Sequence, residues 1–87
     1  MNTIQRLNIW LQGNNAKLCC PIIHHKNKSY FMVVVPVFDK RKGLHYIFGT
    51  LHDIEPIGLE FSPCGISYYT RIEDAVKAAN KYVKRFL

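Results

Sequence analysis

The segment YFMVVVPVF, residues 30–38, carries the strongest structural signal in this chain. Valines and flanking aromatic residues are typical of a β-strand. Because the stretch is apolar at consecutive positions, both of its faces must be covered, and we expect the central strand of a sheet. One cover is expected from a C-terminal helix. The other is expected from an N-terminal helix or from a second copy of the chain.

The segments around this strand predict an antiparallel meander. Pro21 indicates that the strand before it lies at a sheet edge, because proline cannot donate a ladder hydrogen bond. Glycine and proline punctuate the later turns. In chain order we expect a strand at 17–25, a turn at 26–29, the central strand at 30–38, a hairpin loop at 39–43, a strand at 44–51, an irregular stretch at 52–65 and a last short strand at 66–69.

Residues 70–87 predict a C-terminal amphipathic helix. Thr70 and Glu73 have the spacing of a capping box. Acidic residues come first and basic residues last, which complements the helix dipole. An apolar stripe at helical spacing is formed by Ile72, Ala75, Val76, Ala79, Val83 and Phe86.

The N-terminal segment 2–12 is also predicted to be a helix. Asn2 and Gln5 are spaced as a capping box, and Leu7 and Trp10 fall on one helical face. Alternating apolar residues at 7, 9 and 11 also fit a strand, so this alternative stays open. The 87 residues are expected to form a single α+β domain, 1–87, with three to five antiparallel strands and a C-terminal helix packed on one face.

Composition favours a polyanionic partner and an intracellular setting. Twelve Lys and Arg against six Asp and Glu give a net charge of +6, which attracts nucleic acid, an anionic membrane surface or an acidic protein. Residues 1–15 lack the apolar core of a signal peptide, and no apolar run is long enough to cross a bilayer. The three cysteines are an odd number. We therefore expect a soluble, cytoplasmic protein without membrane contact.

The candidate binding residues are the cations of the hairpin loop and of the C-terminal helix. In a sequential meander the loop at 40–42 and the start of the helix lie at the same end of the sheet, so Lys40, Arg41, Lys42 and Arg71 are predicted to form the main positive site. The helix face adds further phosphate contacts. The predicted nucleic-acid-binding residues are Lys40, Arg41, Lys42, Arg71, Lys77, Lys81, Lys84 and Arg85.

Two partial resemblances bear on this hypothesis. Residues 42–49, KGLHYIFG, resemble the basic-glycine-aromatic strand of RNA-recognition domains. That fold requires a helix where only the turn at 26–29 is available, so we expect these rings to pack in the sheet core. Residues 46–50 and 70–79 resemble the last strand and helix start of three-strand-plus-helix DNA-binding domains. Those domains lack an insertion such as 51–69, and they read DNA with basic residues that 30–38 does not contain.

No catalytic, metal or cofactor site is expected. Cys19, Cys20, His24 and His25 have zinc-ligand chemistry, but residues alternating along one strand point to opposite faces. Cys64, His52 and Asp53 have the residue types of a thiol nucleophile, base and orienting acid, without spacing that brings them together. Asp53, Glu55 and Glu60 do not form a calcium-loop pattern.

Two functions are favoured by the sequence, and a third, a small nuclease or other enzyme, stays open because basic small domains sometimes cut what they bind. The favoured hypothesis is a small non-enzymatic module that binds DNA or RNA through electrostatic phosphate contacts. The alternative is a protein-binding adaptor or inhibitor of the phage or mobile-element type, acting through strand addition at 17–25 or as a homodimer.

Overall fold

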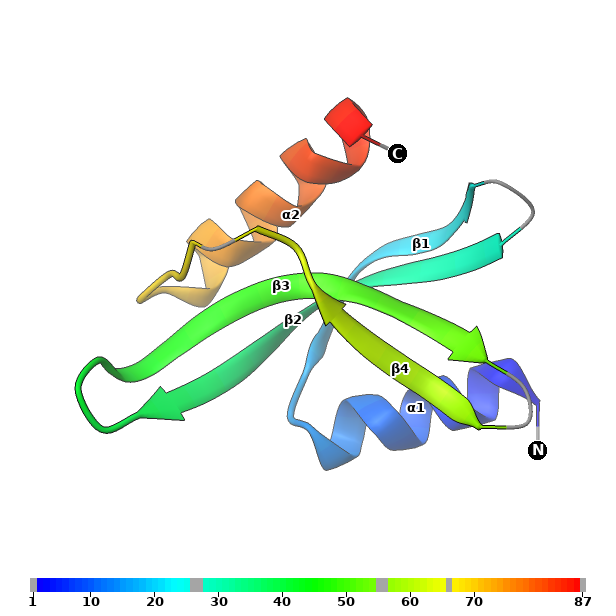
Figure 1. The fold of residues 1–87 in the computed structure, drawn as a ribbon, viewed down its shortest axis with the longest axis horizontal. Helices are drawn as coiled ribbons and strands as arrows, with labels where there is room; N and C mark the ends of the chain where they lie inside the picture. Colours follow the sequence, from blue (N-terminus) through cyan, green and yellow to red (C-terminus); the bar gives the residue numbers. More distant parts are fainter. Residues whose placement is uncertain (1, 26–27, 55–56, 66, 87) are drawn as a thin grey trace.

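The fold is a four-stranded antiparallel sheet with one helix on each face (Figure 1). The computed structural model describes residues 2–25, 28–54, 57–65 and 67–86, except for the side chains of 20–25 and 28–29. The predicted α+β architecture is confirmed. Its elements are α1 (Thr3–Gly13), β1 (Lys17–His25), β2 (Lys28–Asp39), β3 (Gly43–Ile54), β4 (Gly58–Pro63) and α2 (Ile72–Phe86).

The strands follow each other in the sheet in their sequence order, β1-β2-β3-β4. As predicted, β2 is an inner strand, and Pro21 lies in a strand at the edge. The pairing of β1 with β2 shifts register twice between Leu18 and Ile23. Such bulges bend a strand and interrupt its regular hydrogen-bonding edge.

The alternation of side chains along β2 divides the core between the two faces. Phe31, Val33 and Val35 pack with Leu7 of α1 on one face. Met32 and Val34 pack with Ala75 and Ala79 of α2 on the other. Figure 1 shows α1 and α2 on opposite sides of the sheet. The second cover predicted for the central strand is therefore the N-terminal helix, and no second copy is needed for it.

The region between β3 and α2 departs from the prediction. Residues 58–63, expected to be irregular, form β4, which pairs with the second half of β3 from Gly49 to Ile54. Residues 67–69, expected within a strand, make only one bridge, between Tyr69 and Tyr46. Hydrogen bonding explains the exchange, because β4 occupies the outer edge of β3 and leaves only the stretch near Tyr46 free. Lys28 and Ser29, expected in a turn, belong to β2, while 26–27 lie outside the described residues.

The start of α2 differs by one residue from the predicted capping box. The carbonyl of Arg71 accepts the first helical hydrogen bond, from the N–H of Ala75 at 3.3 Å. Arg71 therefore occupies the N-cap position, and Thr70 precedes it. Glu73 lies 3.7 Å from the guanidinium of Arg71 instead of closing a box. At α1, by contrast, the predicted capping box of Asn2 and Gln5 is present in both directions.

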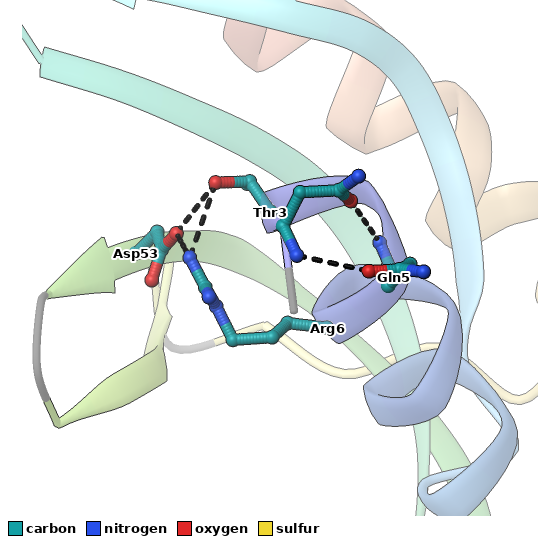
Figure 2. Close-up of polar contacts among 5 residues, drawn as sticks. Thr3, Gln5, Arg6 and Asp53 are labelled. Atoms are coloured by element: carbon teal, nitrogen blue, oxygen red, sulfur yellow. Dashed lines mark hydrogen bonds and ion pairs between the residues drawn. The ribbon is translucent and has the colours of Figure 1, made fainter.

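The Arg6 side chain ties α1 to the sheet (Figure 2). Its guanidinium and the Thr3 hydroxyl both donate to Oδ2 of Asp53 at the end of β3, the hydroxyl at 2.7 Å. These two hydrogen bonds, Arg6 first, hold the pKa of Asp53 below its ordinary value of 3.8. The side chains of Arg6 and Asp53 are only 25% and 12% exposed, so solvent screens the pair weakly.

We expect Asp53→Asn to lower the free energy of unfolding by about 1–2 kcal/mol at pH 7, because a charge-assisted contact is lost. The unfolded state takes up its proton first as pH falls, since the folded pKa is the lower one. The stabilisation is therefore complete above pH ~5 and is lost below ordinary carboxyl pKa values. Urea unfolding of both proteins at several pH values measures this convergence.

The matched control is Glu73→Gln, which removes an ion pair whose side chains are 72% and 64% exposed. We expect a change of less than about 0.5 kcal/mol there. Equal effects of the two substitutions at pH 7 would contradict the role assigned to Asp53.

Candidate functional site

A shallow groove of about 440 Å³ lies between the flank of α2, the segment before it and β3. Exposed cations and aromatic rings meet on its surface. The segment before α2 is held against β3 by two backbone hydrogen bonds, from Tyr46 N–H to the Tyr69 carbonyl at 2.7 Å and from Tyr69 N–H to the Tyr46 carbonyl at 2.9 Å. The groove is lined by Phe48, Ser67, Tyr69, Ala78, Lys81, Tyr82, Arg85 and Phe86.

Four aromatic rings form a connected cluster in the groove. Phe48, 7% exposed, has its ring centroid 6.3 Å from that of Tyr69 and 5.7 Å from that of Tyr82. Tyr82 and Phe86 are one helical turn apart, and their centroids lie 4.8 Å from each other. Phe86 is 58% exposed at the rim. The rings thus descend from an accessible rim to a buried floor.

The position of Phe86 corrects the sequence interpretation. It was expected on the buried stripe of the C-terminal helix, but α2 ends there, beyond the sheet residues that cover Ala75 and Ala79. Tyr82 takes a place against the core instead. Its pKa is raised, first by the neighbouring Cys64 and then by burial.

Two predicted cations lie on the groove itself. Lys81 and Arg85 are exposed, one helical turn apart, and both line it. The guanidinium carbon of Arg85 is 5.5 Å from the centroid of the Phe86 ring, within cation–π range. Lys77 and Lys84 are also exposed on α2 but do not line the groove.

A second group of predicted cations lies at the β2–β3 turn, at the left of Figure 1. Lys40, Arg41 and Lys42 are all exposed. Asp39 shapes this turn, since its carboxylate accepts the N–H groups of Arg41 at 2.7 Å and Lys42 at 3.1 Å. These two hydrogen bonds hold the pKa of Asp39 below its ordinary value. The turn therefore presents its three cations in a defined backbone conformation.

Lys42 connects the turn with the segment before α2. Its ammonium lies 4.4 Å from the centroid of the Tyr68 ring, which also meets His45 edge-on at 5.2 Å. Arg71 follows three residues after Tyr68 and is exposed beside Glu73. The predicted residues thus fall into the turn group, Arg71 at the helix start, the groove pair, and the outer lysines 77 and 84.

Sequence reasoning missed the aromatic half of the groove. A usable signal existed in α2, where Lys81, Tyr82, Arg85 and Phe86 interleave cations and rings at one-turn spacing. Tyr69 carried no such signal, because its place depends on the bridge to Tyr46. The rings of 42–49 behave as expected in part: Phe48 is buried in the core, but it also forms the groove floor.

The residue types considered for thiol chemistry are not brought together. Cys64 packs beside Tyr82 on the α2 face, and burial raises the pKa of its thiol, which lowers the fraction of reactive thiolate. Asp53 is engaged by Arg6 and Thr3 on the α1 side. His52 lies opposite Glu60 in the pairing of β3 with β4, and its ring centroid is 4.9 Å from that of Tyr30.

Among the described residues, no three His, Cys, Asp or Glu side chains are grouped so as to hold a metal ion. Three of the four residues considered as zinc ligands have side chains outside the described part of the chain, namely Cys20, His24 and His25. Glu55, considered for calcium, also lies outside it. Cys19 is described, and its thiol lies 3.8 Å from the carbonyl of Lys17.

Neither helix in the described part of the chain is long and apolar enough to cross a membrane. Comparisons with protein-family models, with curated proteins and with solved structures found no match to this chain.

Proposed function

We propose that this chain is a nucleic-acid-binding module without catalytic activity. The observation that carries the proposal is the pair Lys81 and Arg85 on the rim of a groove floored by aromatic rings. Cations attract the phosphate backbone, and ring faces stack on bases. The groove therefore offers contacts to both the phosphate and the base of a nucleotide. The net charge of +6 supports the same polyanionic partner.

The β2–β3 turn extends the proposed interface. Lys40, Arg41 and Lys42 are exposed, and the oxygen Oδ1 of their only acidic neighbour in the turn, Asp39, accepts backbone N–H groups. Arg71 just before α2, and Lys77 and Lys84 on its exposed surface, add further positive charge. These residues act through sequence-independent attraction to phosphates.

We expect replacing Lys40, Arg41 and Lys42 together by alanine to weaken binding and to flatten its salt dependence. Each lost phosphate contact reduces the slope of log K against log salt by about 0.7 for single strands and about 0.9 for duplexes. Three contacts therefore predict a reduction of roughly 2–3. Fluorescence anisotropy with labelled single-stranded DNA, RNA and duplex DNA, at low and near-physiological salt, measures both quantities.

Lys17→Ala, which removes an exposed cation at the start of β1, serves as the single-charge control. The slope of log K against log salt should fall by no more than the loss of one charge predicts, about 0.7 for single strands and about 0.9 for duplexes. Absence of binding to all three polymers at low salt, or an affinity indifferent to salt, would refute the proposal.

One observation favours the alternative of a protein-binding module. Phe38 and Leu44 face each other across the β2–β3 hairpin and are 75% and 55% exposed. The other supports are weaker, because α1 covers the second sheet face and bulges interrupt β1. Sedimentation of the purified chain tests the homodimer: a dimer dissociated by Phe38→Asp would favour the alternative.

A further inference from the structure

We infer that the groove beside α2 receives an unpaired, single-stranded segment, with a base stacked on Phe86 and adjoining phosphates at Lys81 and Arg85. This inference rests on the proposed function and names the form of nucleic acid that the site accepts. It goes beyond electrostatic attraction, which does not distinguish paired from unpaired strands.

The ring faces are the first reason for an unpaired strand. In a duplex the faces of the bases are stacked on one another, so only phosphates and base edges reach a protein. The groove offers Phe86 at its rim and Tyr69 and Tyr82 behind it. Phe86 is 58% exposed as a residue, and the guanidinium of Arg85 lies 5.5 Å from its ring centroid. An exposed ring next to a cation can stack on a base that is not paired and stacked within a duplex.

The shape of the surface is the second reason. Duplex readers insert a helix or a β-ribbon into the major groove. Here α2 lies flat on the sheet, with Ala75 and Ala79 buried against it. Its cations Lys81 and Arg85 line a groove and do not lie on a protruding helix that could enter the major groove. The groove beside α2, about 440 Å³, falls in the lower part of the range of about 300–1,000 Å³ typical of small-ligand sites. It therefore suits a short flexible segment of strand.

The rigidity of the cluster is the third reason. Tyr69 is fixed by its backbone bridge, and Phe48 is buried in the sheet. Tyr82 is held between Phe48 and Phe86 beside Cys64. Stacking on rings that are already in place costs little further ordering. Phe86 is the most exposed of these rings, so its removal tests stacking with the least disturbance of the core.

The test compares Phe86→Ala with Phe38→Ala in the full chain. Phe38 is the more exposed ring and does not line the groove. Anisotropy titrations use a short unstructured single-stranded DNA, the RNA of the same sequence, and the corresponding duplex, at near-physiological salt. We expect single strands to bind more tightly than the duplex. Phe86→Ala should lose about tenfold on single strands and little on the duplex, while Phe38→Ala stays near wild type.

Salt titrations separate stacking from charge. Phe86→Ala should keep the wild-type salt slope, because stacking releases no counterions. Lys81→Ala should lower the slope on single strands by about 0.7. Lys77→Ala, an exposed lysine one turn away and outside the groove, should lower the affinity less. The DNA and RNA titrations distinguish the two sources of an unpaired strand.

A second variant at Phe86 separates loss of the ring from loss of folded structure. Phe86→Leu keeps an apolar side chain at the end of α2 but removes the ring face. It should keep the wild-type melting transition and still lose single-strand affinity. Full affinity in both Phe86 variants, or preference for the duplex, overturns the inference while salt-dependent binding preserves the proposed function. No binding of any polymer overturns both.

Discussion

Replacing Val34 with aspartate is expected to abolish cooperative folding. Val34 is 1% exposed in β2 and packs between Met32, Phe48 and the α2 residues Ala75 and Ala79. A domain of 87 residues has roughly 4–13 kcal/mol of stability. An unpaired carboxylate in this position costs several kcal/mol, in addition to about 1.5–3 kcal/mol of lost apolar burial. Together these costs consume most or all of the stability. Circular dichroism during heating measures the loss of the transition.

Phe38→Asp is the matched control for this change. Phe38 belongs to the same strand and, four residues on, points to the same face as Val34. It is 75% exposed, so a carboxylate there remains hydrated. We expect Phe38→Asp to melt cooperatively at a temperature near that of the wild type. A native transition in Val34→Asp would show that β2 is not the buried centre of the sheet.

Gly49→Ala is expected to destabilise the domain by about 3 kcal/mol, at the upper end of overpacking effects. A methyl group at Gly49 would lie 2.4 Å from the carbonyl oxygen of Ser62 and 2.7 Å from two carbons of the Phe61 ring. Because one of these neighbours is backbone, β4 itself must move. For a domain of this size the melting temperature falls by roughly 12–24 °C.

Position 49 requires a glycine because the Phe61 side chain lies directly over it. Phe61 passes over Gly49 and stacks on Trp10 of α1, with ring centroids 5.9 Å apart. Trp10 is the single tryptophan of the chain, so its fluorescence reports whether Phe61 has moved. We expect the Trp10 emission of the Gly49→Ala protein to shift before global unfolding.

Gly13→Ala is the control, because an added Cβ at the end of α1 has no atom within 4 Å. Its melting temperature should stay within a few degrees of the wild type. Equal melting temperatures for the two alanine variants would show that β4 does not approach β3 as closely as the structure has it.

The missed strand and the missed groove have the same physical origin. β4 is a short, half-exposed edge strand, Gly-Leu-Glu-Phe-Ser-Pro, whose glycine and proline are typical of a loop when the segment is considered alone. It becomes a strand because β3 extends to Ile54 and offers its outer edge to residues 58–63. In the same way, Tyr69 enters the groove only because β4 leaves the edge of β3 free at Tyr46.

The elements that the sequence predicts correctly are those in which the local pattern of apolar and capping residues agrees with the packing in the folded structure. Residues 30–38 are apolar on both faces and lie inside the sheet, and the Asn2–Gln5 box begins α1 as its spacing indicates. At α2 the stripe through Ala75 and Ala79 is buried as expected, while Phe86 is not. Periodicity assigns a residue to a face, but it does not say how far the opposing sheet extends.

Sequence patterns alone predict the α+β class, the central strand and the amphipathic C-terminal helix, and they place the cations along the chain. These properties follow from short-range patterns of apolar and charged residues. Contacts between distant parts of the chain establish that β4 exists and that α1 covers the second face of the sheet. The same kind of contact brings four rings together beside Lys81 and Arg85, namely Phe48, Tyr69, Tyr82 and Phe86. The reason is that strand pairing joins residues far apart in the chain, and the free edge left by one pairing determines the place of the next.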